Sequence, residues 1–198
     1  NMSIARNRLA GGGTQTAALA FGGGPVATAA TEQYNSGVWS NAPATMTIAR
    51  SELGSSGTQT AALAFGGFPT TGATEEWVAS EGGNTGTVGG TWSAAPSNMI
   101  TPRQALAGAG TQAAALAFGG LAPGTTGATE QYISGVWGAA PSNMITPRSD
   151  VAGVGTQAAA LAFGGNGGPG VGLTTATEEY SGGTWSPGGS NMITPRVG

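Results

Sequence analysis

A ten-residue phrase occurs four times in this chain and constrains its fold more than any other feature. The first copy reads TQTAALAFGG and begins at Thr14, and the other copies begin at Thr58, Thr111 and Thr156. Self-similarity at a fixed period is typical of repeat architectures, in which each unit is one supersecondary element that packs against the next. The sequence therefore predicts an array of four similar units.

Each copy of the phrase is followed by further landmarks in a fixed order. An Ala-Thr-Glu tripeptide comes first, then an aromatic residue two positions after its Glu, then a Trp and finally a Met-x-x-x-Arg phrase. The aromatic residues are Tyr34, Trp77, Tyr132 and Tyr180, and the closing tryptophans are Trp39, Trp92, Trp137 and Trp185. The closing tryptophans are 53, 45 and 48 residues apart, a period typical of blade-like units of four strands. We divide a single domain, residues 1–198, into units of about 1–44, 45–97, 98–142 and 143–198.

Local patterns predict four short strands in each unit. In the first unit we expect strands at 6–13, 16–21, 31–34 and around Val38 and Trp39. The second of these is apolar on both faces, as in a strand that is covered on both sides, and a Gly-Gly pair ends it. Residues 113–117 also have good helix propensity, but the run is too short for a helix and has no amphipathic period.

Five segments differ in length and wording while the rest of the unit repeats. One is an insertion in the second unit, Val78 to Gly90, which we expect to be a surface loop. The other four follow the Gly-Gly pairs: Gly24 to Ala29, Phe68 to Gly72, Leu121 to Gly127 and Asn166 to Thr175. Binding residues are commonly carried by loops on a rigid scaffold, so a binding site is expected in these segments.

The order of landmarks resembles the kelch repeat, which has an Arg-led first strand, a Gly-Gly pair, a Glu and Tyr on the third strand and a Trp on the fourth. In the second unit the matching residues are Arg50, Gly66-Gly67, Glu75, Trp77 and Trp92. The resemblance covers essentially the whole chain and implies an all-β, kelch-like β-propeller with four blades of four short antiparallel strands.

This chain departs from the kelch pattern in three respects. Ala-Leu-Ala-Phe replaces the larger residues before Gly-Gly, Trp77 stands in place of Tyr, and four units are fewer than most kelch propellers contain. Two arrangements stay open: the four units close a ring, or further units come from another part of the chain or from a second copy. The chain begins within a Met-x-x-x-Arg phrase, as expected of an excerpt from a longer or processed polypeptide.

The Ala-, Gly- and Thr-rich wording of the repeats is also similar to kelch-like arrays in structural proteins of marine tailed phages, cyanophages among them. This resemblance implies a virion or extracellular protein that acts as a fibre, decoration or attachment module. Its partners would be other virion proteins or a host-surface ligand, either protein or glycan, and a homo-oligomer is compatible with this role. Two alternatives remain: a glycan-binding, lectin-like propeller and a protein-binding kelch adaptor domain.

Charged residues make up only 8% of the chain, so their recurrence is informative. One Arg precedes one Glu by 25 to 30 residues in every unit: Arg6 and Glu32, Arg50 and Glu75, Arg103 and Glu130, and Arg148 and Glu178. Because a buried charge needs a partner, we predict a structural ion pair within each blade or across the seam between blades. The alternative is a ring of charges that lines a central channel.

The recurring Trp and Tyr side chains are predicted to form the core between sheets, because repetition at fixed positions is what a core requires. The alternative is a set of sugar-stacking platforms. Burial of one such side chain stabilises the fold by roughly 1.5–3 kcal/mol.

Composition argues against several classes of function. The chain has no His and no Cys, which removes the usual general base, thiol nucleophiles and imidazole metal ligands. Adjacent acids such as Glu75 and Glu76 point to opposite faces of a strand, so we expect no enzyme, no cofactor and no metal. A net charge of −3 without any Lys argues against nucleic acid as a partner, and no apolar run is long enough for membrane insertion.

Overall fold

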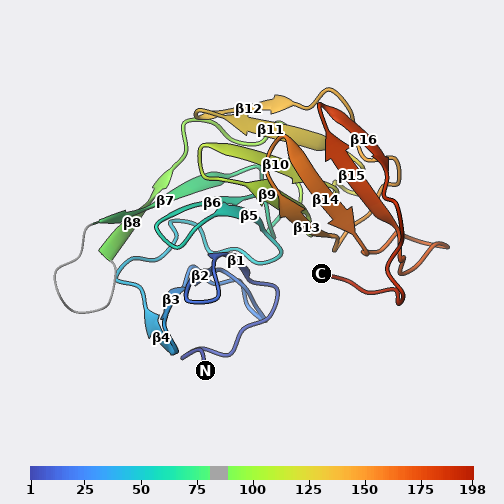
Figure 1. The fold of residues 1–198 in the computed structure, drawn as a ribbon. Coiled ribbons are helices and arrows are strands. Elements are labelled where there is room, and N and C mark those ends of the chain that lie inside the picture. Colours follow the sequence, from blue (N-terminus) through green and yellow to red (C-terminus); the bar gives the residue numbers. More distant parts are fainter. Residues whose placement is uncertain (81–88) are drawn as a thin grey trace.

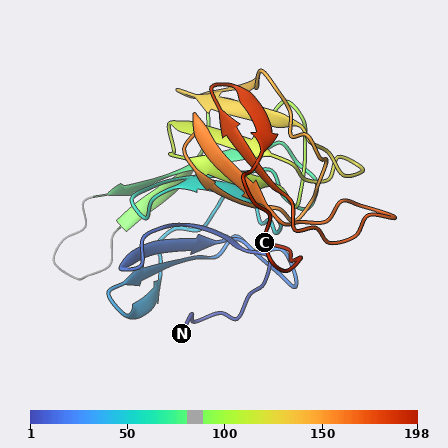
Figure 2. The same ribbon diagram turned by 45° about the vertical axis from the view of Figure 1, so that its right-hand side comes forward.

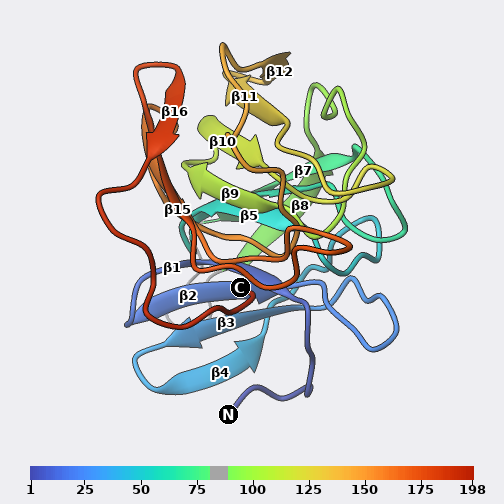
Figure 3. The ribbon, with the colours of Figure 1, turned by 90° about the vertical axis from the view of Figure 1, so that its right-hand side faces the viewer.

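The computed structural model describes residues 1–80 and 89–198, whose regular elements are all β-strands (Figure 1). The described residues form four antiparallel sheets of four strands each. The sheets are arranged around a common axis as the blades of a four-bladed β-propeller, and the first strand of each sheet lies innermost (Figures 1 and 3). Among these residues, no helix has the length and hydrophobicity needed to cross a membrane.

Within each blade the strands follow one another in sequence order from the axis to the rim. Blade 1 contains β1 Ala10–Gly13, β2 Ala17–Phe21, β3 Thr31–Asn35 and β4 Val38–Asn41. Blade 2 contains β5 Gly54–Gly57, β6 Ala61–Phe65, β7 Thr74–Ser80 and β8 Gly89–Ala94. Blade 3 contains β9 Ala107–Gly110, β10 Ala114–Phe118, β11 Thr129–Ile133 and β12 Val136–Ala139. Blade 4 contains β13 Ala152–Gly155, β14 Ala159–Phe163, β15 Thr177–Ser181 and β16 Thr184–Pro187.

The repeated phrase forms the second strand of every blade, which reads AALAF in all four copies. The Ala-rich stretch that could have been a helix is β10, and it pairs with β9 on one side and β11 on the other. The Gly-Gly pair then turns the chain with positive φ angles, 64° at Gly66 and 112° at Gly67. A Cβ atom at Gly66 would lie 2.6 Å from the carbonyl oxygen of Arg103, so glycine is required both for the turn and for the approach of the next blade's lead segment.

Two predicted boundaries were wrong. The first strand of blade 1 begins at Ala10 and not at Arg6, because Arg8 has a φ of 53° that a strand does not allow. The insertion in blade 2 is not a loop from its first residue, because Val78 pairs with Thr91 and lengthens the β7–β8 hairpin. Residues 81–88 of that insertion lie outside the described residues.

The same aromatic contact joins each blade to the next. The Phe at the end of the second strand packs edge-on against the closing Trp of the following blade: Phe21 with Trp92, Phe65 with Trp137, and Phe118 with Trp185, at centroid distances of 4.9, 5.1 and 5.1 Å. The indole N–H of each of these tryptophans donates a hydrogen bond to the hydroxyl of Thr31, Thr74 or Thr129 in the preceding blade. The three hydrophobic clusters of the described residues coincide with these three seams.

The seam does not recur between blade 4 and blade 1. Among the described strands, β1 packs beside β5, β5 beside β9 and β9 beside β13, but β13 and β1 do not pack against each other in this way. The four blades therefore form an arc, and the C-terminal segment returns from β16 towards its middle (Figures 1 and 2).

Candidate binding face

All the loops that follow the Gly-Gly pairs lie at one end of the propeller. In every blade the second strand ends beside the start of the first strand and the start of the third; Phe21, for example, pairs with Ala10 and Thr31. The variable loops therefore share this end, here called the loop face, with the Met-x-x-x-Arg segments that lead into each first strand. In blade 2, β7 ends at Ser80 and β8 begins at Gly89, both at the opposite end.

A chain of backbone hydrogen bonds runs around the axis on the loop face. It links the residue two positions after each recurring Arg: Arg8, Glu52, Ala105, Asp150 and Gly198. Each backbone N–H from residue 52 onwards donates to the carbonyl oxygen of the preceding member, at donor–acceptor distances of 2.8 to 2.9 Å. The four non-glycine members have φ angles of 50° to 55°. This left-handed conformation costs energy in residues with a Cβ, and such strain is often concentrated at functional sites.

These residues line the mouth of the central cavity, which has a volume of 160 Å³. Leu9, Leu53, Leu106 and Val151 form its apolar wall. The Arg8 guanidinium donates to the Glu52 carboxylate at 2.6 Å, and the Arg8 side chain is 65% exposed. The cavity thus combines charged groups with apolar side chains, as ligand sites commonly do.

Sequence reasoning missed Arg8, Glu52 and Asp150 as residues of a site. A signal was available in the repeat itself. When the units are aligned on the recurring Arg, the position two residues later reads Arg, Glu, Ala, Asp and Gly, while the Arg itself never changes. A position that varies inside an otherwise repeated phrase indicates a surface residue whose side chain the packing of the blades does not constrain.

A second hollow lies between the variable loops of blades 3 and 4. Its volume is 570 Å³, and Leu121, Pro123 and Thr125 from one loop face Asn166 and Pro169 from the other. Ser149 and Asp150 form part of its lining, and Asp150 also lines the central mouth. Hydroxyl, amide and carboxylate groups beside proline and leucine surfaces can hold a small polar ligand or a side chain of a partner.

The predicted ion pairs lie under this face, each within its own blade. The Arg–Glu distances are 2.6 Å for Arg6–Glu32, 2.7 Å for Arg50–Glu75, and 2.9 Å for both Arg103–Glu130 and Arg148–Glu178. Every one of these eight side chains is at most 4% exposed. The pairs do not cross the seams, and none of these residues lines the central mouth.

Each ion pair also forms hydrogen bonds that hold the loop face on its blade, as in blade 3. Nη1 of Arg103 donates to the carbonyl oxygens of Gly119 and Ala128, which flank the variable loop of that blade. The Glu130 carboxylate accepts hydrogen bonds from the backbone N–H groups of Ile100 and Thr101 in the lead segment. One ion pair thereby fixes both segments that reach the loop face.

Burial and hydrogen bonding shift the pKa values of these groups in opposite senses. Burial lowers the pKa of Arg103, and the charge and hydrogen bond of Glu130 oppose that shift. For Glu32, burial alone would raise the pKa, but hydrogen bonds from Ser3 together with the Arg6 guanidinium hold it below its usual value. The Glu32 carboxylate is therefore stabilised in its charged form.

The predicted structural aromatics divide into two groups. Trp77, Trp92, Tyr132, Trp137, Tyr180 and Trp185 are buried between blades. Tyr34 and Trp39, both on blade 1, are partly exposed. None of these eight residues lines either cavity of the loop face, so they do not form sugar-stacking platforms there.

One seam tyrosine has a strongly perturbed environment. The Tyr132 hydroxyl donates to the carboxylate of Glu76 in the preceding blade at 2.6 Å. Burial raises the pKa of Tyr132, and the hydrogen bond and negative charge of Glu76 raise it further. The hydroxyl thus stays protonated and acts as a fixed donor across the seam.

Comparison with known proteins shows the fold. No protein-family model matches this sequence, and no curated protein matches it. The solved structure of YjhT aligns with a TM-score of 0.72 over 97% of this chain and 72% of that chain, at 12% sequence identity. At this level of identity the likeness shows a shared β-propeller fold.

Proposed function

We propose that this propeller is a non-catalytic recognition module that binds its partner through the loop face. The observation that carries the proposal is the segregation of variable and repeated parts. The four loops that follow the Gly-Gly pairs differ between units and gather at one end, around the mouth and the hollow, while the same ion pairs and aromatic contacts recur beneath them. A rigid scaffold that presents variable loops is the usual design of a binding domain.

The recurring carboxylates support a non-catalytic role. Glu32, Glu75, Glu130 and Glu178 are engaged in buried ion pairs. On the loop face, Glu52 is paired with Arg8, and Asp150 accepts a hydrogen bond from Ser149. Without histidine or cysteine in the chain, the loop face offers neither a thiol nucleophile nor an imidazole base.

The finer proposal is an attachment or decoration module of a virion or another extracellular structure. Its support is the similarity of the repeat wording to kelch-like arrays of phage structural proteins. On this proposal the loop face contacts a host-surface protein or glycan, or a neighbouring virion protein.

Glycan binding is the second candidate, and the hollow between blades 3 and 4 favours it. Thr125, Ser149, Asp150 and Asn166 supply hydroxyl, carboxylate and amide groups there, and Pro123 supplies an apolar surface. Saccharides present hydroxyl groups and C–H faces that match such a lining.

The test is a pair of matched glycine substitutions in blade 3. Gly124 lines the hollow and Gly138 lies in β12; at both sites a new Cβ would meet nothing within 4 Å. Gly124→Trp should fill the hollow, and Gly138→Trp should leave it open. Fluorescently labelled protein would be measured on a glycan array and on a panel of bacterial cells, the cells treated with periodate or with protease.

We expect the parent and Gly138→Trp to bind equally and Gly124→Trp to lose binding. Loss after periodate treatment would identify a glycan, and loss after protease treatment would identify a protein. Equal binding by both variants would reject the loop face around this hollow as the recognition site.

A further inference from the structure

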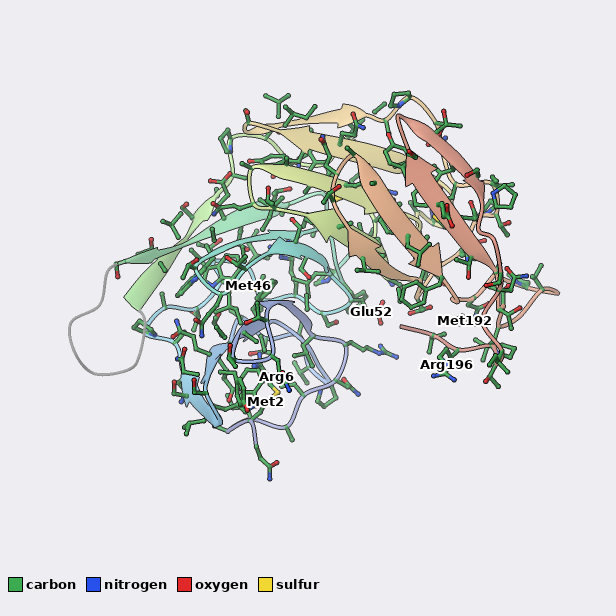
Figure 4. The ribbon with its side chains drawn as sticks, viewed as in Figure 1. Met2, Arg6, Met46, Glu52, Met192 and Arg196 are labelled. Carbon is green, nitrogen blue, oxygen red and sulfur yellow. The ribbon has the colours of Figure 1, made fainter. Side chains whose placement is uncertain are left out.

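One position on the loop face carries a carboxylate in two blades, and only one of the two has a cationic neighbour. In blade 2 the position is Glu52, near the middle of the arc of blades (Figure 4), and its partner is Arg8, which occupies the same position in blade 1. In blade 4 the position is Asp150, and the preceding member of the chain of backbone hydrogen bonds is Ala105, which carries no charge. The Glu52–Arg8 pair thus shows which kind of group a carboxylate at this position binds.

The Asp150 carboxylate has one oxygen to offer a ligand. Its Oδ2 atom accepts a hydrogen bond from the Ser149 hydroxyl at 2.9 Å. Within residues 1–80 and 89–198, no arginine forms an ion pair with Asp150, and its Oδ1 atom has no hydrogen-bond donor. Asp150 is partly exposed and lines both the central mouth and the hollow between blades 3 and 4. A cationic group that enters either cavity can therefore reach this carboxylate.

The hollow beside Asp150 has room for a small ligand because glycine forms part of its lining. Gly124, Gly170 and Gly172 line it, and a Cβ atom at any of the three would meet nothing within 4 Å. Its volume of 570 Å³ lies within the usual range for small-molecule sites. A single lysine or arginine side chain of a partner would leave much of that space empty.

The two loops that enclose the hollow are held in place. Gly168 approaches Thr125 so closely that a Cβ atom on the glycine would lie 3.0 Å from the threonine hydroxyl. Within the loop of blade 4, the N–H of Gly168 donates to Asn166 Oδ1 and the N–H of Gly167 donates to the Gly172 carbonyl oxygen, both at 2.9 Å. Because the loops are already ordered, a ligand loses less free energy in fixing them.

We propose that the hollow binds a saccharide with a free amino group, whose ammonium takes the place against Asp150 that the Arg8 guanidinium takes against Glu52. Asp150 is the one charged residue among the described residues of the lining, so it attracts a cation and repels acidic saccharides. The hydroxyl and amide groups of the lining would contact sugar hydroxyls, and Pro123 would contact a C–H face. This inference rests on the glycan candidate of the proposed function and specifies the charge of that glycan.

The experiment is calorimetric titration of the full chain with a trisaccharide of glucosamine, with its N-acetylated form and with trilysine. Asp150→Asn removes the negative charge but keeps an acceptor for Ser149, and asparagine tolerates the φ of 50° at this position. Glu179→Gln makes the same change of charge at an exposed residue of β15 that lines neither cavity, and it serves as the control. Gly124→Trp fills the hollow.

We expect the parent and Glu179→Gln to bind the glucosamine trisaccharide equally. Asp150→Asn should bind it about tenfold more weakly, because the ammonium loses a charged hydrogen-bond partner, and its remaining affinity should depend less on salt. Gly124→Trp should lose binding. The N-acetylated trisaccharide should bind the parent no better than it binds Asp150→Asn.

Three results would overturn the proposal. Equal binding of both trisaccharides by the parent and by Asp150→Asn, lost in Gly124→Trp, would support a glycan site that does not select for charge. Tighter binding of trilysine than of either trisaccharide, weakened in Asp150→Asn, would assign the hollow to a basic protein partner. Binding of neither trisaccharide at the highest concentration reached would reject the amino saccharide, whereas the array measurement with Gly124→Trp and Gly138→Trp reports separately on the loop face.

Discussion

Blades 3 and 4 have nearly the same sequence and the same internal structure, yet their surfaces are buried to different extents. Phe118 in blade 3 is fully buried under Trp185, whereas the equivalent Phe163 in blade 4 is partly exposed. Their second strands both read AALAF. The difference therefore comes from the neighbour and not from the strand.

What is unchanged between these blades is equally instructive. The ion pairs Arg103–Glu130 and Arg148–Glu178 have the same N–O distance of 2.9 Å, and both are buried. The Tyr–Trp contact inside each blade also has the same centroid distance of 5.2 Å. Interactions within a blade are set by the repeat alone, and interactions between blades depend on which blade lies alongside.

The largest expected effect concerns the buried ion pairs, which lie within one blade and do not depend on the neighbouring blade. Glu130→Ala and Glu178→Ala should each lower the free energy of unfolding by about 3–5 kcal/mol, because each leaves a buried arginine without its partner. Glu52→Ala should cost at most about 1 kcal/mol, because Arg8 is largely exposed and surface pairs contribute little.

Urea unfolding followed by tryptophan fluorescence would measure all three variants. Similar losses for Glu130→Ala and Glu52→Ala would contradict the assignment of the buried pairs. A much smaller loss for Glu178→Ala than for Glu130→Ala would show that the pair does depend on the neighbouring blade.

The second prediction concerns the aromatic seam. Phe118→Ala should cost about 3–5 kcal/mol, as is usual when a fully buried phenylalanine is truncated. Phe163→Ala should cost roughly half as much, since part of its surface is already in water in the folded state. Chemical denaturation under conditions where the protein is a single chain gives both values, and equal losses would mean that Phe163 is covered.

A smaller effect is expected from the indole hydrogen bond. Trp137→Phe removes the donor to the buried Thr74 hydroxyl and should cost about 1–3 kcal/mol. Trp39→Phe loses no such bond and should cost less than about 0.5 kcal/mol, as is typical of surface substitutions. Thermal unfolding of the two variants in one buffer compares them directly. A larger loss of stability in Trp39→Phe than in Trp137→Phe would contradict this expectation.

The smallest predicted effect is a pH dependence in blade 1. The pKa of Glu32 is lower in the folded chain than the ordinary value of 4.5, so the unfolded chain binds the proton more readily. The carboxylate therefore stabilises the fold above pH 4.5, and this contribution is lost as the pH falls through the lower folded pKa. Stability measured between pH 6 and pH 2.5 should fall less steeply in Glu32→Gln than in the parent, and an unchanged slope would contradict the shift.

Much of the fold was predictable because the same pattern of residues occurs in all four units. The recurrence of Gly-Gly, of Glu two residues before an aromatic and of the closing Trp predicts four-stranded blades, and comparison with a propeller structure supports that architecture. The spacing of Arg50 from Glu75 likewise led to the pairing that the structure shows.

Other features were not predictable because they depend on the arrangement of blades. Sequence spacing does not tell which blade covers Phe21, or that Trp39 packs on Tyr34 of its own blade and on no other blade among the described residues. The left-handed φ angles of Glu52 and Asp150 are imposed by the hydrogen bonds around the axis and not by residue type. The hollow on the loop face also depends on how far two loops of different length lean towards each other.

The most direct test of this account is the hydrogen exchange rate of the five indole N–H groups, followed by NMR on a single-chain sample. Trp92, Trp137 and Trp185 donate to buried threonine hydroxyls and Trp77 donates to the Gln59 carbonyl oxygen, whereas Trp39 has no acceptor among the described residues. We expect four slowly exchanging indole protons and one fast one, which belongs to Trp39. Slow exchange at Trp39, or fast exchange at any of the three seam tryptophans, would contradict it.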